Sequence, residues 1–339
     1  MKPEEQLQEE KGLRFSKSKL FFYIFAAIIF VGSIYYFSQI KGSIALFRQI
    51  RPAWLVVAIA AQIGTYFFGA TVFERLLRTF QISFIRVKEL FQASIVMLFI
   101  NQTIPTVGVS GHMFFFNFLK KRGVSEDRAL PLILTELLTF YSAIIGIIIV
   151  LVLLCALLPT IPSLFAPILF AGIAVYAVLA MLVGLLGRGS SVLYILKKIS
   201  RISFLKKAID QYETFSFSGL KSPWRAFREH PTIVAESIFF QVCIFLCDSI
   251  TILALFRGVN IHVPFLFIML GFMVTLIIAL LPISPGALIV YEGSMTFFYV
   301  SLGVPLAAAG IVTILYRVLS FWAPIPLGFF LYRKLQLSD

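Results

Sequence analysis

Long apolar stretches constrain the fold of this chain more than any other feature of its sequence. A helix needs about 20 mostly apolar residues to cross the ~30 Å hydrocarbon core of a bilayer. Six stretches approach or exceed that length: 20–37, 52–73, 129–157, 163–187, 231–256 and 306–331. The chain is 60% hydrophobic and only 13% charged, whereas soluble domains are about 45–50% apolar and ~25% charged. These features predict an all-α polytopic membrane protein with about six full spans.

Two further apolar stretches, 89–119 and 264–302, are broken near their middle, the first by Pro105 and the second by Pro282 and Pro285. At 1.5 Å per residue, each limb of the first would rise only about 21–24 Å, which is too short for two crossings. We therefore predict two re-entrant helical hairpins. Irregular backbone is tolerated at membrane depth only where protein or a water-filled cavity surrounds it.

The positive charges predict how the spans are oriented. Most of the 29 Lys and Arg residues fall in five places: 1–19, 75–88, 120–128, 188–228 and 333–334. The opposite side of the predicted membrane holds only Lys41, Arg48, Arg51 and Arg257. The positive-inside rule then places both termini in the cytoplasm, and we expect a multi-pass protein of the cell (plasma or inner) membrane. Hairpin 89–119 would enter from the cytoplasm, and hairpin 264–302 from outside.

The two hairpins also align with each other. At a fixed offset of 180 residues, PTVGVSGHMFFFNFLKKRGV from Pro105 matches PGALIVYEGSMTFFYVSLGV from Pro285. His112 then lies opposite Glu292. One residue of slip further on, TELLTFY aligns with YRVLSFW, and Glu136 falls opposite Arg317. Similar elements in opposite orientation predict an inverted repeat.

The predicted halves are 20–187 and 231–334, preceded by a cytoplasmic tail, 1–19. Between the halves lies 188–230, where SVLYILKKISRISFLKKAIDQY places apolar residues at helical spacing among basic ones. That pattern is typical of a helix on an anionic membrane surface, with a plain soluble linker as the alternative. The net charge of +13 follows this topology, so we expect no nucleic-acid partner.

The breaks in the hairpins are the first candidate binding features. The second helix of each hairpin would begin near Pro105 or Pro285, and Gly108, Gly111 and Gly286 follow these prolines. Unpaired N–H groups at such a helix start suit an anion such as a phosphate or carboxylate, and small residues let it approach. The alternative is a purely structural kink.

Ionisable residues inside apolar segments are functional candidates because they are costly in lipid unless paired or hydrated. Glu136 and Arg317 could pair with each other or contact a ligand. Glu292 could carry a proton or could cap nearby backbone donors. His112 could change charge near neutral pH or could simply be hydrogen-bonded.

Three more polar residues complete the candidate binding set. Asp248 lies deep in its span, where Arg257 could reach towards it. Asn101 and Gln102 precede the first break and could satisfy freed carbonyls or line a cavity. The three cysteines predict ordinary buried thiols, and we expect no metal and no cofactor. No ATP-binding or catalytic motif is found, so we do not expect an enzyme.

The second half resembles the signature of the lysylphosphatidylglycerol synthase transmembrane region family in LPISPGALIVYEG, LGVP and LYRVLSFWAPIPLGFFLY. NQTIPTVGVSGHMFFFNFLKKRGVS resembles the first-half motif of that family, and the resemblance runs from about residue 20 to the end. It implies a flippase-like membrane protein without the soluble aminoacyl-transferring domain of larger members. The family's Pro-Gly-Gly is Pro285-Gly286-Ala287 here, and its usual hairpin arginine is His112, which leaves the bound headgroup open.

The resemblance implies a transporter of an amphiphilic lipid: an anionic phospholipid, an aminoacylated lipid, a polyprenyl phosphate or a hopanoid-type lipid. The headgroup would cross through a polar cavity between the hairpins. One alternative is a secondary transporter of a small soluble anion. Another is a non-transporting membrane subunit that recruits a lipid-modifying enzyme through 188–230. Association into a homo-oligomer is left open.

Overall fold

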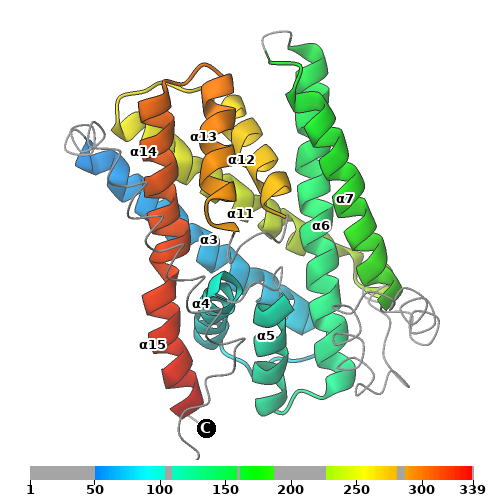
Figure 1. Cartoon of the computed structure of the whole chain (residues 1–339). Coiled ribbons are helices and arrows are strands. Elements are labelled where there is room, and N and C mark those ends of the chain that lie inside the picture. The colour runs from blue at the N-terminus through cyan, green and yellow to red at the C-terminus, as the bar shows by residue number, and fades with distance from the viewer. Residues whose placement is uncertain (1–49, 104–108, 159–160, 187–226, 281–286, 338–339) are drawn as a thin grey trace, which may run out of the picture. The chain divides into compact units, whose positions relative to one another are not determined.

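The computed structural model describes residues 50–103, 109–158, 161–186, 227–280 and 287–337 (Figure 1). Within these ranges every regular element is a helix. The predicted span 20–37, the tail 1–19, nearly all of the stretch 188–230 and the tips of both predicted hairpins lie outside the described residues.

Five helical segments are long and apolar enough to cross a membrane. They are α3 (Pro52–Thr79), α6 (Glu126–Leu157), α7 (Phe165–Leu186), α11 (Pro231–Gly258) and the run Leu306–Leu335, which contains α14 (Leu306–Arg317) and most of α15 (Pro324–Leu337). Their surfaces carry large exposed apolar side chains, such as Phe67, Leu153 and Phe330, as a lipid-facing surface requires. The predicted class, an all-α polytopic membrane protein, is confirmed.

Four shorter helices form two packed pairs where the hairpins were predicted. α4 (Val87–Thr103) packs against α5 (Val109–Lys121), and α12 (Phe265–Ala279) packs against α13 (Val290–Ser301). In Figure 1 the first pair lies in the lower part of the drawn helices and the second in the upper part. This arrangement agrees with hairpins of opposite orientation, and their re-entry through a membrane face stays a prediction.

Two matching turns support the predicted repeat. In 118–124, at the end of α5, four backbone hydrogen bonds run from the N–H groups of Arg122, Gly123 and Val124 back to the last turn of the helix, two of them from Arg122. Residues 298–304, at the end of α13, repeat the same four donor–acceptor pairs at an offset of 180 residues. Gly123 and Gly303 have φ angles of +79° and +88°, the left-handed conformation that ends many helices at glycine. The alignment therefore extends from sequence to backbone geometry.

The helices α3 and α11 form the centre of the arrangement. Each has 28 residues and begins with proline, which suits the first helical position because no N–H is needed there. They run antiparallel: the Arg51 N–H donates to the Gly258 carbonyl at 3.1 Å, and Arg75 Nη1 lies 3.2 Å from Glu236 Oε2 at the other end. Equivalent helices of the two halves thus face each other.

Close helix contacts depend on glycine at several places, of which Gly328 and Gly271 are two. A Cβ atom at Gly328 of α15 would lie 2.3 Å from Phe99 Cβ of α4, and one at Gly271 of α12 would lie 2.5 Å from the Tyr299 ring of α13. In lipid the hydrophobic effect does not drive helices together, so their association relies on such close packing and on hydrogen bonds. These contacts hold α4 to α15 and close the second helix pair.

Candidate functional site

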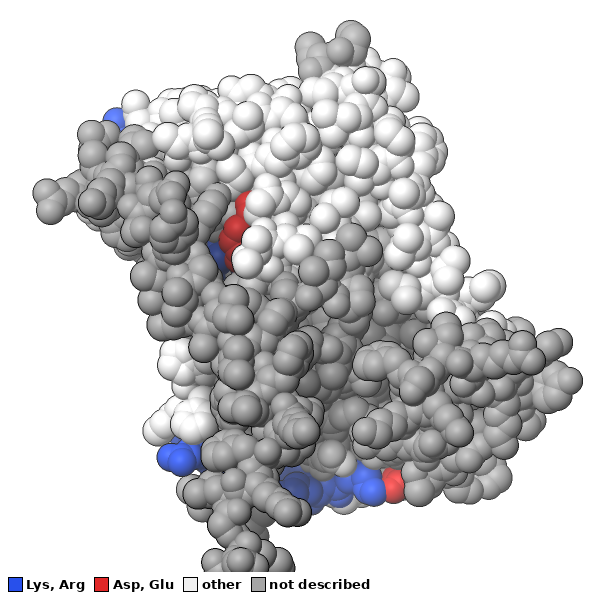
Figure 2. Space-filling model, in the orientation of Figure 1, with Lys and Arg blue, Asp and Glu red and all other residues white. Residues whose placement is uncertain are grey.

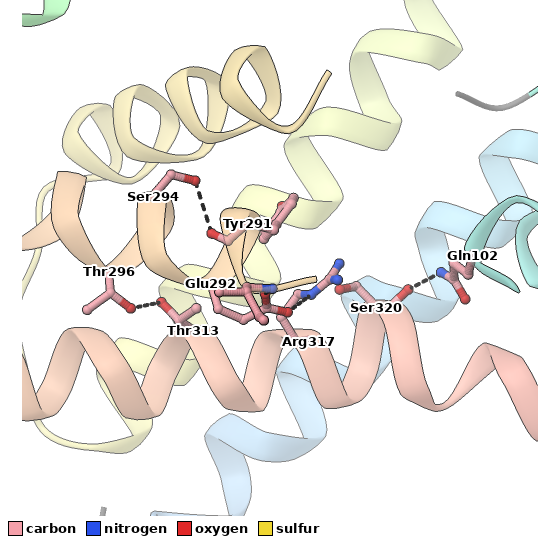
Figure 3. Close-up of polar contacts among 9 residues, drawn as sticks. Gln102, Tyr291, Glu292, Ser294, Thr296, Thr313, Arg317 and Ser320 are labelled. Carbon is pink, nitrogen blue, oxygen red and sulfur yellow. Dashed lines mark hydrogen bonds and ion pairs between the residues drawn. The ribbon is translucent and has the colours of Figure 1, made fainter. Parts of the chain in front are cut away.

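An ion pair joins the start of α13 to the end of α14 (Figure 3). Arg317 Nε donates to Glu292 Oε1 at 2.6 Å, and Glu292 Oε2 accepts the backbone N–H of Ile289 at 2.5 Å. The guanidinium carbon of Arg317 lies 4.5 Å from the centre of the Tyr291 ring and 4.2 Å from that of Phe321. The Arg317 and Glu292 side chains are only 8% and 17% exposed. The positive end of α13 is therefore covered by its own carboxylate, which also holds the arginine.

The equivalent place in the first half holds a second polar contact. His112 Nε2 of α5 lies 3.0 Å from Glu136 Oε2 of α6. Gln241 Nε2 of α11 donates to Glu136 Oε1 at 3.1 Å. Both oxygens of this buried carboxylate are thus engaged, and the contact connects the first half to a helix of the second.

The sequence left two alternatives for Glu136 and Arg317, mutual pairing or contact with a ligand, and the structure does not show the mutual pair. Each is bound instead to the hairpin residue of its own half, Glu136 to His112 and Arg317 to Glu292. The physical reason is the repeat itself, because equivalent residues of two related halves make equivalent contacts within each half. The alternative in which Glu292 caps backbone donors is present in the structure.

Gln102 bonds to a backbone carbonyl, as one of the two sequence interpretations held, whereas Asn101 instead accepts a backbone N–H. Asn101 Oδ1 accepts the N–H of Gly111 near the start of α5 at 2.7 Å. A Cβ at Gly111 would lie 2.4 Å from that same oxygen, so glycine is needed there. Gln102 Nε2 donates to the carbonyl of Ser320 at 2.9 Å (Figure 3).

The acceptor of Gln102 belongs to a break in the last span that the sequence analysis missed. Residues Val318–Trp322 form a π-helical turn, in which the Ala323 N–H bonds to the Val318 carbonyl at 2.8 Å. The carbonyl of Leu319 is thereby freed, and it accepts the Tyr66 hydroxyl at 3.2 Å. Pro324 has no N–H to offer Ser320. The prolines of FWAPIP were the available signal, and such π turns are frequent at functional sites.

Asp248 lies where α11 crosses α3, and Gln62 Nε2 donates to its Oδ1 at 3.5 Å. Arg257 is nine residues further along the same helix, about 14 Å at 1.5 Å per residue. Among the described ion pairs none joins these two residues, so the suggested contact is not made. Pro105, Gly108, Pro285 and Gly286, the predicted anion-binding positions, lie outside the described residues.

The turn before α13 is conformationally strained. Ala287 and Ile289 have φ angles of +53° and +71°, a region that residues with a Cβ rarely adopt. A β-branched residue such as Ile289 is especially unfavourable there. Strain of this kind persists only where surrounding contacts enforce it, and it is common at functional sites.

Basic side chains form a pocket of about 390 Å³ between the C-terminal end of α5 and α15. Its lining residues are Phe114, Asn117, Phe118, Lys120, Lys121, Arg122, Tyr332 and Leu335. Two of the cations are paired, Lys120 with Glu126 and Arg122 with Glu89. Figure 2 shows most basic atoms of this face gathered at its lower end, and acidic and basic atoms side by side midway along it.

Apolar spans, charges concentrated at one end and ion pairs inside the helical core define a polytopic α-helical membrane protein with a polar interior. Residues 23–328 match the family described as the lysylphosphatidylglycerol synthase TM region, and the chain belongs to that family. Membership indicates a membrane protein of lipid-related function. No curated protein and no solved structure shows a significant match.

Proposed function

We propose that this protein is a flippase-like transporter, which moves the headgroup of an anionic or aminoacylated lipid between leaflets while the acyl chains stay in the bilayer. Family membership supports a lipid substrate. The carrying observation is the presence of two polar pairs at equivalent positions, the His112–Glu136 hydrogen bond and the Glu292–Arg317 ion pair, each tying a hairpin helix to the following span. Ionisable groups within spans are functional by default, and inverted repeats are the common framework of alternating access.

Arg317 is the proposed phosphate contact. A guanidinium can donate two parallel hydrogen bonds to the oxygens of a phosphate, just as it can to those of a carboxylate. A lipid phosphate would compete with Glu292 for Arg317 and so release the start of α13 from α14. In the first half Glu136 would attract the ammonium group of an aminoacylated headgroup. The opposite polarity of the two pairs therefore suits a headgroup that carries both charges.

The basic pocket between α5 and α15 is the proposed approach route for the headgroup. Anionic lipids are attracted to Lys and Arg near the membrane surface by about 1 kcal/mol per basic residue. The pocket volume of about 390 Å³ lies within the range of small-ligand sites. By the predicted topology this end faces the cytoplasm.

The test is lipid movement in proteoliposomes, followed with fluorescent and aminoacylated lipids of several headgroups. Arg317→Ala and Glu292→Gln are compared with wild type and with Glu236→Gln, a control whose carboxylate pairs with Arg75 and is 48% exposed. We expect headgroup-selective movement in wild type and in the control, and its loss in both pair variants. Unchanged movement in Arg317→Ala would contradict the proposal.

The same vesicles separate the alternatives. Uptake of radiolabelled inorganic phosphate without lipid movement would identify a small-anion carrier. Folded, oriented protein that moves neither would favour the recruiting subunit. Transport that survives deletion of 188–230 would speak against that last role, since recruitment was assigned to this stretch.

A further inference from the structure

A third polar cluster lies where α3 packs on α11 beside the π-helical turn. It adjoins the Arg317–Glu292 pair through Tyr316, which stacks on Tyr291 with a ring-centre distance of 6.3 Å. We call it the central oxygen cluster and define it by Gln62, Asp248, Tyr316, Ser320 and Gln102. Gln62 donates to Asp248, the Tyr316 side chain lies beside both Asp248 and Ser320, and Gln102 bonds to the Ser320 carbonyl. The cluster joins both halves and the break in the last span.

Three oxygens of this cluster are buried and make no hydrogen bond of good geometry to the described residues: Gln62 Oε1, Gln102 Oε1 and Ser320 Oγ. The hydroxyls of Tyr66 and Tyr316 lie beside the first and the third of these groups. The Gln62 residue is only 5% exposed, and its amide nitrogen donates to Asp248 while the oxygen of the same amide is the unpaired atom. Native proteins pair nearly all buried polar atoms. Three unpaired oxygens in one connected cluster therefore point to a ligand that binds oxygen lone pairs, such as a cation.

The chemistry of the cluster selects a hard monovalent cation. Its donors are a carboxylate, amide oxygens and a hydroxyl, which suit cations that prefer oxygen. Among the described residues no cationic side chain lies within 4.0 Å of Asp248, and no group of three His, Cys, Asp or Glu could hold a metal. One carboxylate neutralises one positive charge, whereas a divalent ion would leave a net charge in a low dielectric. Broken spans in transporters bind sodium in this way.

We propose that the central oxygen cluster is a sodium site, with Asp248 as the charged ligand and the Gln62 and Ser320 oxygens as neutral ones. This inference rests on the proposed function for its role, which is to couple lipid movement to the sodium gradient. Ser320 lies on the π-helical turn that links α14 to α15, three residues after Arg317 in the chain. Ion binding would thus act on the same segment that carries the proposed phosphate contact.

The experiment measures sodium binding without any lipid transport. Full-length protein in nanodiscs is assayed for ²²Na⁺ binding, and its thermal unfolding is compared in NaCl, KCl and choline chloride at equal ionic strength. At ten times the dissociation constant, linkage predicts a sodium-specific rise in Tm of about 2–5 °C. We expect Asp248→Asn to bind at least about tenfold more weakly, because ligand charge sets much of the affinity. Glu236→Gln should bind as wild type does.

Several outcomes overturn the site. These are equal stability in all three salts together with no ²²Na⁺ binding by wild type, or full binding by Asp248→Asn. If Asp248→Asn does not fold, Gln62→Met, which keeps the carboxylate, should weaken ²²Na⁺ binding, and undiminished binding counts against the site. Lipid movement that is independent of sodium would contradict the proposed sodium coupling and leave the proposed function intact. Sodium binding without lipid movement would contradict the proposed function and leave the sodium site in place.

Discussion

The two halves of this protein make equivalent polar contacts but place the carboxylate on opposite partners. In the first half the hairpin helix carries His112 and the span carries Glu136, whereas in the second the hairpin carries Glu292 and the span carries Arg317. The backbone turns that separate each pair match at an offset of 180 residues. The comparison teaches that the repeat preserves where a polar contact is made but not its polarity.

The halves also differ in how many tasks one residue performs. In the first half Asn101 caps the start of α5 and His112 makes the contact with the span. In the second half Glu292 does both, because one oxygen accepts the Ile289 N–H and the other binds Arg317. Displacing Arg317 therefore disturbs the start of α13, which Glu292 caps, while displacing Glu136 leaves the cap of α5 in place.

The largest expected effect comes from removing the arginine of the second pair. Arg317→Gln leaves the Glu292 carboxylate without its cation inside the helical core, and breaking a buried pair costs about 3–5 kcal/mol. Glu136→Gln should cost only about 1 kcal/mol, because a neutral amide can still bond to His112 or Gln241. Denaturant unfolding in detergent measures both. Equal losses would break the contrast between the two halves.

A charge exchange tests whether the two positions are truly equivalent. His112→Glu with Glu136→Arg places the second-half pair in the first half. Each single change should be destabilising, and we expect the double variant to recover about 1–3 kcal/mol relative to their sum. A double-mutant cycle from unfolding free energies gives this coupling. Strict additivity would show that the first half cannot accommodate the reversed pair.

The next effect concerns the π-helical break in the last span, which has no counterpart in the continuous helix α6 of the first half. Gln102→Leu removes the donor to the Ser320 carbonyl, and we expect a loss of about 1–3 kcal/mol. Pro324→Ala restores an N–H four residues after Ser320, so the same Gln102→Leu change should cost less in that background. The two costs are compared by thermal unfolding. The same loss in both backgrounds would mean that proline is not the reason for the freed carbonyl.

The smallest difference is expected where the halves are most alike. Gly123→Ala and Gly303→Ala meet no atom within 4 Å of the added Cβ, so each cost comes from the left-handed backbone alone, about 1–2 kcal/mol. The two losses in unfolding free energy should agree. Gly293→Ala, a helical glycine that is also open, is the matched control and should be neutral or stabilising. Unequal losses at the two turns would weaken the repeat.

Much of the architecture was determined by the sequence alone. Span length, apolarity and helix-breaking prolines are local properties, and a bilayer imposes the same length on every span. They were enough to predict the helical membrane class, both helix pairs and the alignment that sets His112 opposite Glu292 and Glu136 opposite Arg317. Family membership over 23–328 confirms the resemblance drawn from the same motifs.

The tertiary structure alone decided which polar groups meet. Gln102 reaches Ser320 across 218 residues and Gln241 reaches Glu136 across 105, and no local pattern encodes such distances. The sequence therefore offered Glu136 and Arg317 as partners, and the fold gave each a partner in its own half. The partner of a charge inside a membrane is set by how helices cross, because desolvation makes the nearest donor or acceptor decisive.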